Sequence, residues 1–276
     1  MDISSPINFH THSRHCDGKG ELVEYAEYAL SHGFSQLGFS GHAPVPFDNN
    51  FAIRNDDYLC YCDEVRSLKN SYQGRLDIRL GLEIDYIPQV LDDFSPLIQQ
   101  GGLEYFIGGV HLVNNPQEDP NDLWFIDGPL QKTYDEGLQR VFHGDIRRGV
   151  TAFFHQTNEM IDRTRPTIVA HCDKIVMHNC GRYFDTNDKW FRYLLYDTIH
   201  HIHEAGCIAE INTRGLYKKR HNDFYPDKET IRYMNTLGIP VIVSTDAHEP
   251  ANLNMFEGAY DFLADIHYKE IVTRIP

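Results

Sequence analysis

The sequence predicts an α/β protein whose parallel strands close into a barrel. Short apolar runs rich in β-branched residues alternate along the chain with longer helical patterns, as they do in parallel sheets with helical connections. Almost every apolar run also ends on a residue that can bind a metal ion. In a closed parallel barrel these ends meet at one face, whereas an open sheet would spread them along an edge. The repetition therefore favours the barrel.

Seven strands are expected, and their apolar runs are typical of strands buried on both faces. They are expected at residues 7–12, 35–43, 77–86, 105–113, 167–175, 207–213 and 240–248. Helical patterns lie at residues 20–32, 56–73, 88–99, 129–162, 188–205, 227–237 and 255–266. Asn187 or Asp188 can cap the helix at 188–205, and Gly206 follows its last turn. Because no repeat or linker interrupts the alternation, residues 1–276 are expected to form a single domain.

The composition limits the classes of partner. The 276 residues are 41% hydrophobic, which is enough material for a sizeable core. The net charge is −15, and the longest basic run is Lys218, Lys219 and Arg220, so no nucleic-acid partner is expected. No apolar run approaches the length of about 18 residues that a membrane span needs, so no membrane partner is expected either. The N-terminus also lacks the pattern of a secretory signal.

The cysteines indicate a reducing compartment. The six of them are scattered without the spacing of a disulfide framework, and Cys60-x-Cys62 has no second cysteine pair to complete a zinc site. All six are therefore expected to be reduced thiols of a cytoplasmic protein. The sequence leaves the oligomeric state open.

The stretch INFHTHSRHCDG, residues 7–18, is the first of the ligand-rich strand ends. His10 and His12 are two residues apart, so on a strand their side chains share one face. One such pair is weak evidence, but potential ligands recur at the other strand ends. The whole set is His10, His12, Asp17, His42, Glu83, His111, His171, Asp246 and His248. Imidazole and carboxylate together suit zinc, manganese or iron rather than calcium, so the set predicts a site for several metal ions, two of which Glu83 can bridge.

The motifs taken in order resemble those of a known superfamily. HTHSRHCDG, LGFSGHAP, GLEIDY, GGVHLV, VAHCDK and VSTDAH are similar to the successive motifs of the polymerase and histidinol phosphatase (PHP) superfamily. HNCGRYF, IDGP, EINTRGLYK and DAHEP also fit its histidinol-phosphatase branch. The resemblance covers nearly the whole chain. It implies a distorted (β/α)7 TIM-like barrel, three divalent metal ions, and hydrolysis of L-histidinol phosphate to L-histidinol and inorganic phosphate in histidine biosynthesis.

The resemblance also implies how the ligands are shared among the three ions, which could be manganese, iron or zinc. The first ion would be held by His10, His12, Glu83 and Asp246, the second by Glu83, His111 and His171, and the third by Asp17, His42 and His248. His15 is an alternative to Asp17, because some relatives place a histidine as the last ligand of the first motif. Asp17 is preferred because it fits the CDG pattern.

A pocket that contains these ions would attract a phosphate dianion even in an acidic protein. Two ions about 3.5–4 Å apart can hold a hydroxide between them and present it in line to phosphorus. Arg182, Arg214 and Lys218 follow the fifth and sixth strands and are expected to bind phosphate oxygens, with Arg182 favoured by the GRYF match. Asp246 or His248 is expected to assist proton transfer to the leaving alkoxide.

Three other functions compete with this hypothesis. The chain could be a PHP-type phosphoesterase or phosphodiesterase that acts on a different small phosphate ester. It could be a metal-dependent amidohydrolase, but those enzymes usually carry a bridging lysine at a strand end, where this chain has Glu83. It could also be a non-catalytic metal-binding domain of the kind that accompanies a polymerase. No polymerase segment is present in the 276 residues, and no expected ligand is missing.

Overall fold

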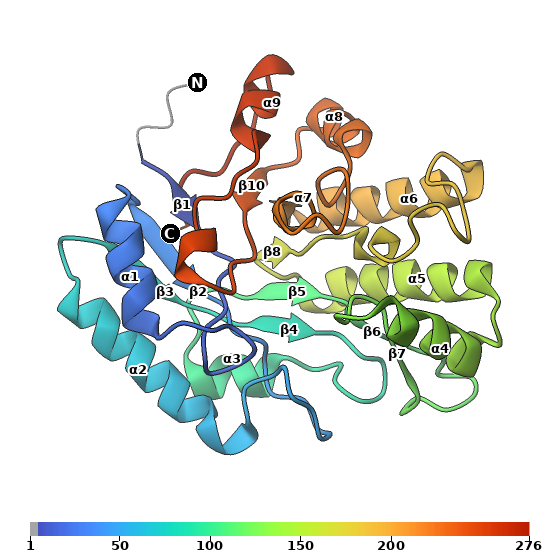
Figure 1. The fold of residues 1–276 in the computed structure, drawn as a ribbon, viewed down its shortest axis with the longest axis horizontal. Helices are drawn as coiled ribbons and strands as arrows, with labels where there is room; N and C mark the ends of the chain where they lie inside the picture. Colours follow the sequence, from blue (N-terminus) through green and yellow to red (C-terminus); the bar gives the residue numbers. More distant parts are fainter. Residues whose placement is uncertain (1–4, 276) are drawn as a thin grey trace.

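The computed structural model describes residues 5–275, with the strands in the centre and the helices around them (Figure 1). The first parallel sheet has the order β1 (Ile7–Asn8), β2 (Gln36–Phe39) and β3 (Asp77–Leu80). The second has the order β10 (Val241–Ser244), β9 (Ile208–Asn212), β8 (Ile168–Val169), β5 (Ile107–Gly109) and β4 (Glu83–Asp85). Every neighbouring pair in both sheets is parallel, as the alternating sequence pattern predicts.

The two sheets close into one distorted barrel. On one side β3 continues into β4 across two residues, and a parallel bridge joins His42 to Glu83. On the other side Thr11 pairs with Ala247, the N–H of His12 donates to the carbonyl of Ala247 at 2.8 Å, and the N–H of Ala247 donates to the carbonyl of His10 at 3.0 Å. Among the described residues, seven parallel strand positions surround the barrel when β3 and β4 are taken as one bent strand.

A small apolar cluster fills the barrel below the strand ends. It is made of Ile7, Phe9, Tyr105, Ile107, Ile168, Ala170, Ile242 and Ile275. The strands β1, β5 and β10 contribute to it although they are not neighbours in a sheet, so their side chains meet across the interior. The hydroxyl of Tyr105 spans the same space and donates to the carbonyl of Phe9 at 2.8 Å. This packed interior lies beneath the carboxyl ends of the strands and supports the residues placed there.

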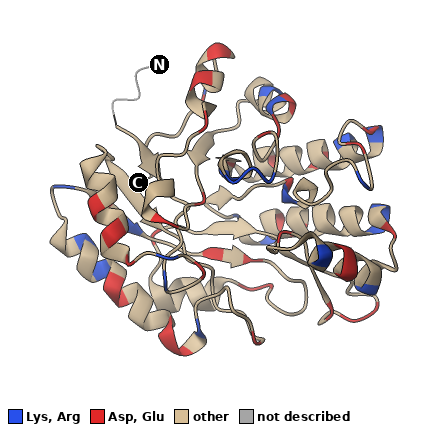
Figure 2. Cartoon of the chain, in the orientation of Figure 1, with Lys and Arg blue, Asp and Glu red and all other residues tan. Residues whose placement is uncertain are grey.

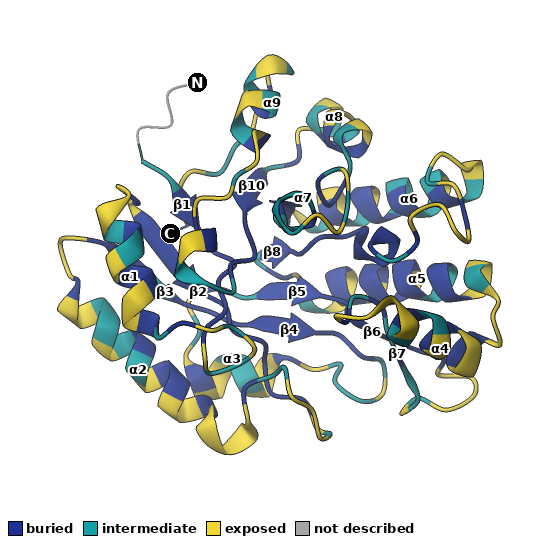
Figure 3. Cartoon of the chain, in the orientation of Figure 1, coloured by how far each residue is buried: buried dark blue, intermediate teal, exposed yellow. Residues whose placement is uncertain are grey.

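The helices cover the outside of the barrel with their apolar faces turned inward (Figure 3). The longer ones are α1 (Leu22–Ser31), α2 (Tyr58–Ser71), α4 (Gln131–Phe142), α5 (Ile146–Thr164), α6 (Lys189–Ala205) and α8 (Lys228–Leu237). The shorter ones are α3 (Ser95–Gly101), α7 (Arg214–Tyr217) and α9 (Ala259–Asp265), with 3-10 turns at Asn55–Asp57, Lys174–Val176 and Pro250–Asn252. Gly206 ends α6 in a left-handed conformation with φ 70°, in the place expected for it.

Two expected helices differ in the structure. The pattern at 129–162 is two helices, because the chain turns at His143 and Gly144, whose φ angles are 54° and 80°. Asp145 then caps α5 by accepting a hydrogen bond from the N–H of Arg148 at 3.1 Å. Within the pattern at 88–99 the chain becomes helical only at Ser95, where Pro96 occupies the first turn, a position that tolerates proline.

Two expected strands are each divided. The run at 77–86 bends between β3 and β4, which lets one segment serve both sheets. The run at 105–113 breaks after β5, because the N–H of His111 donates to the carboxylate of Asp85 at 2.8 Å instead of continuing the ladder. The chain then forms an antiparallel hairpin of β6 (Leu112–Asn114) and β7 (Leu123–Phe125), which the alternating pattern did not predict.

Lysine and arginine are dispersed over the outer helices and loops among aspartate and glutamate (Figure 2). Within residues 5–275, the structure has no helix that is both long and apolar enough to cross a membrane. The six cysteines are free thiols, as expected.

Candidate metal centre

The strand ends carry the candidate ligands into one site. In five strands the second residue after the strand is a side chain of this site. These residues are His10 after β1, His111 after β5, His171 after β8, Arg214 after β9 and Asp246 after β10. Because parallel strands all present their carboxyl ends at the same face of a barrel, the shared spacing brings these side chains together.

Glu83, the first residue of β4, lies at the centre of the site and is only 1% exposed. Its two carboxylate oxygens face five imidazole nitrogens. Oε2 lies 3.1 Å from His10 Nε2, 3.4 Å from His12 Nε2 and 3.2 Å from His42 Nδ1, and Oε1 lies 3.1 Å from His171 Nε2 and 3.4 Å from His111 Nε2. Each oxygen thus has its own group of histidines, which is the arrangement that a carboxylate bridging two ions requires.

Three of these nitrogens have no hydrogen-bond partner among the described residues although they are buried. They are Nε2 of His10, Nε2 of His12 and Nδ1 of His42. A buried polar atom without a partner costs about 1–3 kcal/mol, so several of them converging on one carboxylate need another explanation. Neutral imidazole and carboxylate are suitable ligands for zinc, manganese and iron, and the donor set therefore fits divalent ions of this kind.

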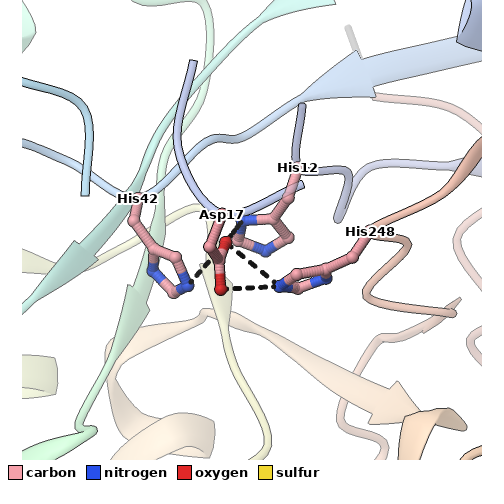
Figure 4. A group of neighbouring side chains, drawn as sticks. All are labelled: His12, Asp17, His42 and His248. Carbon is pink, nitrogen blue, oxygen red and sulfur yellow. Dashed lines mark hydrogen bonds and ion pairs between the residues drawn. The ribbon is translucent and has the colours of Figure 1, made fainter. Parts of the chain in front are cut away.

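His12, Asp17, His42 and His248 form a second part of the cluster, with one ligand atom from each within 4.8 Å of the others (Figure 4). Asp17 points between the three rings and lies 3.2 Å from His248 Nε2 and 3.8 Å from His42 Nε2. The groups of Glu83, His111 and His171 and of His10, His12 and Glu83 meet the same distance limit. The groups overlap, because His12 belongs to two of them, and Asp246 meets the limit with His10 and His171 rather than with His12 and Glu83.

His15 lies outside this cluster. Its Nε2 is 2.9 Å from the carboxylate of Glu64 on α2, and its ring contacts the edge of Tyr61. The structure thus brings Asp17, rather than His15, to the other candidate ligands.

Two buried carboxylates that were not predicted from the sequence contact the Nδ1 atoms of two candidate histidine ligands, on the side of each ring away from Glu83. Asp85 Oδ1 lies 2.9 Å from Nδ1 of His111, and Glu210 Oε1 lies 2.5 Å from Nδ1 of His10. The other oxygen of Glu210 accepts the backbone N–H of His171 at 2.8 Å. A histidine that binds a metal commonly donates its second ring N–H to such a carboxylate, which fixes both the tautomer and the direction of the ring.

The charges of the cluster oppose one another. Burial alone would lower the pKa of His10, but Glu83, Glu210 and Asp246 together raise it well above the usual value. Burial and the neighbouring His248 and His42 instead hold the pKa of His12 well below its usual value. Although burial would raise the pKa of Glu83, the surrounding histidines hold it well below normal. The site is therefore rich in ionised carboxylates, and cations that bind there would displace the proton that these carboxylates favour on His10.

Two residues of the site have unusual backbone angles. The φ angle of His171 is 20° and that of Asp246 is 50°, and both residues follow a strand directly enough to turn the chain at its end. Such angles cost about 1–3 kcal/mol in a residue other than glycine and persist where the surrounding structure demands them. Here they accompany the inward placement of two candidate ligands.

A cavity of about 270 Å³ opens onto the cluster. Three cations line it, and they are Lys174, Arg214 and Arg220. Arg214 Nη1 donates to the carbonyl of Asp246 at 2.6 Å and lies 2.7 Å from His248 Nδ1. Lys174 is 3% exposed, and its Nζ lies 3.7 Å from both Asp127 Oδ2 and Asp246 Oδ2. The cavity therefore joins a cluster of candidate metal ligands to cations that can bind an anion.

Of the three cations expected to bind phosphate, only Arg214 lines this cavity. Arg182 makes two hydrogen bonds to Asp135 on α4, at 3.0 and 2.9 Å, and Lys218 Nζ lies over the ring of Tyr217 at 5.5 Å. Lys174 and Arg220 were not assigned a role from the sequence. Lys174 belongs to the VAHCDK motif and Arg220 to the basic run at 218–220, so the sequence contained a pattern that could have indicated each residue.

We expect Arg182→Ala to change the inhibition constant of inorganic phosphate by less than about twofold, because a guanidinium held by a carboxylate is not free to bind a second anion. Competitive inhibition of phosphate release measures this constant. Arg214→Ala is the comparison and should raise it by about tenfold or more. A similar rise for Arg182→Ala would show that Arg182 leaves Asp135 to bind phosphate.

The fold and the site define a class of protein, an α/β barrel with a candidate centre for several metal ions at the carboxyl ends of its strands. The PHP domain family matches residues 8–214, well over half of the chain, and the chain belongs to this family.

Curated relatives agree with this membership. The chain is 26% identical over 265 residues to a Schizosaccharomyces pombe protein named "probable histidinol-phosphatase", and the alignment covers 91% of this chain and 83% of the relative. It is 24% identical over 264 residues to the histidinol-phosphatase of Bacillus subtilis, and this alignment covers 88% of this chain and 94% of the relative. These identities are low, but the matches extend over most of each chain.

Solved structures share the fold. A Listeria monocytogenes protein assigned as a histidinol phosphatase superposes with a TM-score of 0.81 at 19% identity, over 92% of this chain and 100% of that one. The histidinol phosphate phosphatase of Lactococcus lactis, crystallised with zinc, L-histidinol and phosphate, superposes with a TM-score of 0.65 at 17% identity, over 96% and 95%. The α/β architecture of the chain is thus that of histidinol phosphatases of known structure.

Proposed function

We propose that the chain is a phosphoric monoester hydrolase that converts L-histidinol phosphate to L-histidinol and inorganic phosphate in histidine biosynthesis. The observation that carries this proposal is the convergence of five imidazole nitrogens on Glu83, in a cavity that Lys174, Arg214 and Arg220 also line. The names of the curated relatives support it, as does the Lactococcus lactis structure with L-histidinol and phosphate.

We further propose that residues 1–276, of which 1–4 and 276 lie outside the described residues, act as one PHP-type phosphoesterase domain in the cytoplasm. Three divalent ions, manganese, iron or zinc, would be held by the nine expected ligands. These are His10, His12, Asp17, His42, Glu83, His111, His171, Asp246 and His248. When bound, such ions supply Lewis-acid chemistry that draws charge from phosphoryl oxygens and activates water as a nucleophile.

The residues of the chain would bind and orient the phosphate. All the hydrogen bonds that the side chain of Arg214 makes to described residues use Nη1, so the remainder of its guanidinium can serve an anion in the cavity. Lys174 and Arg220 would add positive charge on the same cavity wall. Asp246 and His248 both line the cavity, and we propose one of them for proton transfer to the leaving alkoxide.

Phosphate release from L-histidinol phosphate, p-nitrophenyl phosphate and a diester tests the proposal. With manganese or zinc present, we expect kcat/KM for L-histidinol phosphate to exceed that for the aryl ester by about 100-fold or more, since a fitted leaving group contributes binding energy that a foreign one lacks. A chelator should abolish all turnover. Faster hydrolysis of the diester or the aryl ester would instead favour a PHP-type phosphoesterase with another substrate.

A further inference from the structure

One part of the cavity contains residues that neither the candidate metal centre nor the phosphate requires. Asp127, Phe51 and Phe125 line it together with Asn50. Asn50 and Phe51 lie in the loop before the 3-10 turn at Asn55–Asp57, whereas Phe125 ends β7 and Asp127 follows it. Their side chains are an acid and two aromatic rings, which differ in chemistry from the cations that line the same cavity.

The two carboxylate oxygens of Asp127 have different surroundings. Oδ2 lies 3.7 Å from Lys174 Nζ and 3.9 Å from His111 Nε2. Oδ1 is buried and has no hydrogen-bond partner among the described residues. The side chain is 14% exposed and lines the cavity, so its carboxylate can accept hydrogen bonds from a bound group that carries N–H donors.

The two phenylalanines form a separate aromatic contact surface. The rings of Phe51 and Phe125 have centroids 5.7 Å apart and are tilted by 35°. Phe51 also meets the ring of His42 edge-on, with centroids 5.5 Å apart, which places the aromatic surface beside a candidate metal ligand. Aromatic faces of this kind favour planar rings, which pack against them by stacking or by edge-to-face contact.

We propose that Asp127 binds the ammonium group of the leaving alcohol, and that Phe51 and Phe125 contact its imidazole ring. This inference rests on the proposed function and assigns its specificity to three residues. The substrate class is the phosphate monoesters of 2-amino alcohols that carry a planar ring.

Asp127 is well placed for selection by repulsion as well as by attraction. Its carboxylate shares a cavity with the cations that would bind phosphate, so it repels any phosphate ester that lacks a compensating positive charge. The segment that carries it is held in place, because His178 Nε2 lies 2.7 Å from the carbonyl oxygen of the next residue, Gly128. The same side chain thus has opposite effects on cationic and purely anionic substrates.

Asp127→Asn tests the ammonium contact with two substrates, L-histidinol phosphate and the analogue that lacks the amino group. For L-histidinol phosphate we expect kcat/KM to fall by about 10- to 100-fold, the size of effect seen when a charged hydrogen-bond partner is lost. For the deamino analogue we expect kcat/KM to stay the same or rise, because the repulsion is removed. Asp119→Asn, at an exposed acid in the loop between β6 and β7, is the matched control and should change neither value.

An equal loss with both substrates, or a loss of bound metal measured by elemental analysis, would overturn the proposal for Asp127. Either result would assign the residue to the metal centre instead.

Phe125→Leu tests the aromatic contact. We expect it to raise KM for L-histidinol phosphate by about fivefold to tenfold, as the loss of an aromatic contact commonly does. L-alaninol phosphate, which keeps the ammonium group and lacks the ring, should be unaffected. Tyr193→Leu, at a site where the side chain is 71% exposed, is the control. Equal effects on both substrates would overturn the aromatic assignment.

The affinity of L-histidinol, measured by calorimetry with the metal-loaded protein, separates this inference from the proposed function. If the wild-type protein does not hydrolyse L-histidinol phosphate but binds L-histidinol, and Asp127→Asn weakens that binding about tenfold, the subsite stands and the proposed function fails. If L-histidinol does not bind, or binds both proteins equally, the subsite is overturned whatever the catalytic result.

Discussion

Glu83→Gln is expected to lower kcat by about a thousandfold or more, because loss of transition-state stabilisation by a metal centre amounts to several kcal/mol. The structure gives the reason. The two oxygens of Glu83 face separate groups of histidines, at 3.1 Å from His10 Nε2 and 3.1 Å from His171 Nε2. An amide keeps one oxygen and directs an NH₂ group at the other set of nitrogens, so it can no longer hold two ions. Single-turnover phosphate release and elemental analysis of the purified variant measure the two effects.

Glu64→Gln is the matched control for this substitution. Glu64 is also a glutamate beside a histidine, since its carboxylate lies 2.9 Å from His15 Nε2, but it stands outside the cluster. We expect its activity and metal content to equal those of the wild-type protein. If Glu83→Gln retained its full metal content and lost less than about tenfold in kcat, the central position of Glu83 would have no catalytic meaning.

The fold could be predicted from the sequence where a local pattern determines it. Apolar runs buried on both faces predicted the parallel strands, and the repeated ligand at each strand end predicted their closure. The division of the helix at 129–162 was not predicted, because its apolar periodicity continues through His143 and Gly144 although both adopt positive φ angles. The break after β5 depends on a hydrogen bond from His111 to Asp85, two residues that are distant in sequence.

The candidate ligands could be found from the sequence because most of them lie near a strand end, and four of them, His10, His111, His171 and Asp246, are the second residue after a strand. The residues that support them could not. Asp85 and Glu210 lie among apolar residues of expected strands, and only their contacts with His111 and His10 reveal a purpose. Position after a strand gives no sign that Arg182 is paired with Asp135, which lies 47 residues earlier on α4. A cation's availability depends on its tertiary partners, which spacing does not record.

Removal of the metal ions is expected to lower the melting temperature by about 8–16 °C. A ligand present at about 1,000 times its Kd stabilises the folded state by about 4 kcal/mol, and each kcal/mol shifts Tm by about 2–4 °C in a protein of about 150–250 residues. The residues explain why the shift should be large. Without cations, buried imidazole nitrogens of His10, His12 and His42 remain without hydrogen-bond partners among the described residues. Thermal melts before and after chelation, and after manganese or zinc is restored, measure the change.

The variant Glu83→Gln makes this prediction specific to the cluster. Chelation should lower the Tm of Glu64→Gln as much as that of the wild-type protein, whereas Glu83→Gln should already melt lower and respond less, since it has lost the shared ligand. A change below about 2 °C in the wild-type protein, with removal of the metals verified by elemental analysis, would contradict the expectation. The apoprotein would then satisfy its buried histidines by itself, and the convergence on Glu83 would reflect a hydrogen-bonded core rather than a site completed by metal ions.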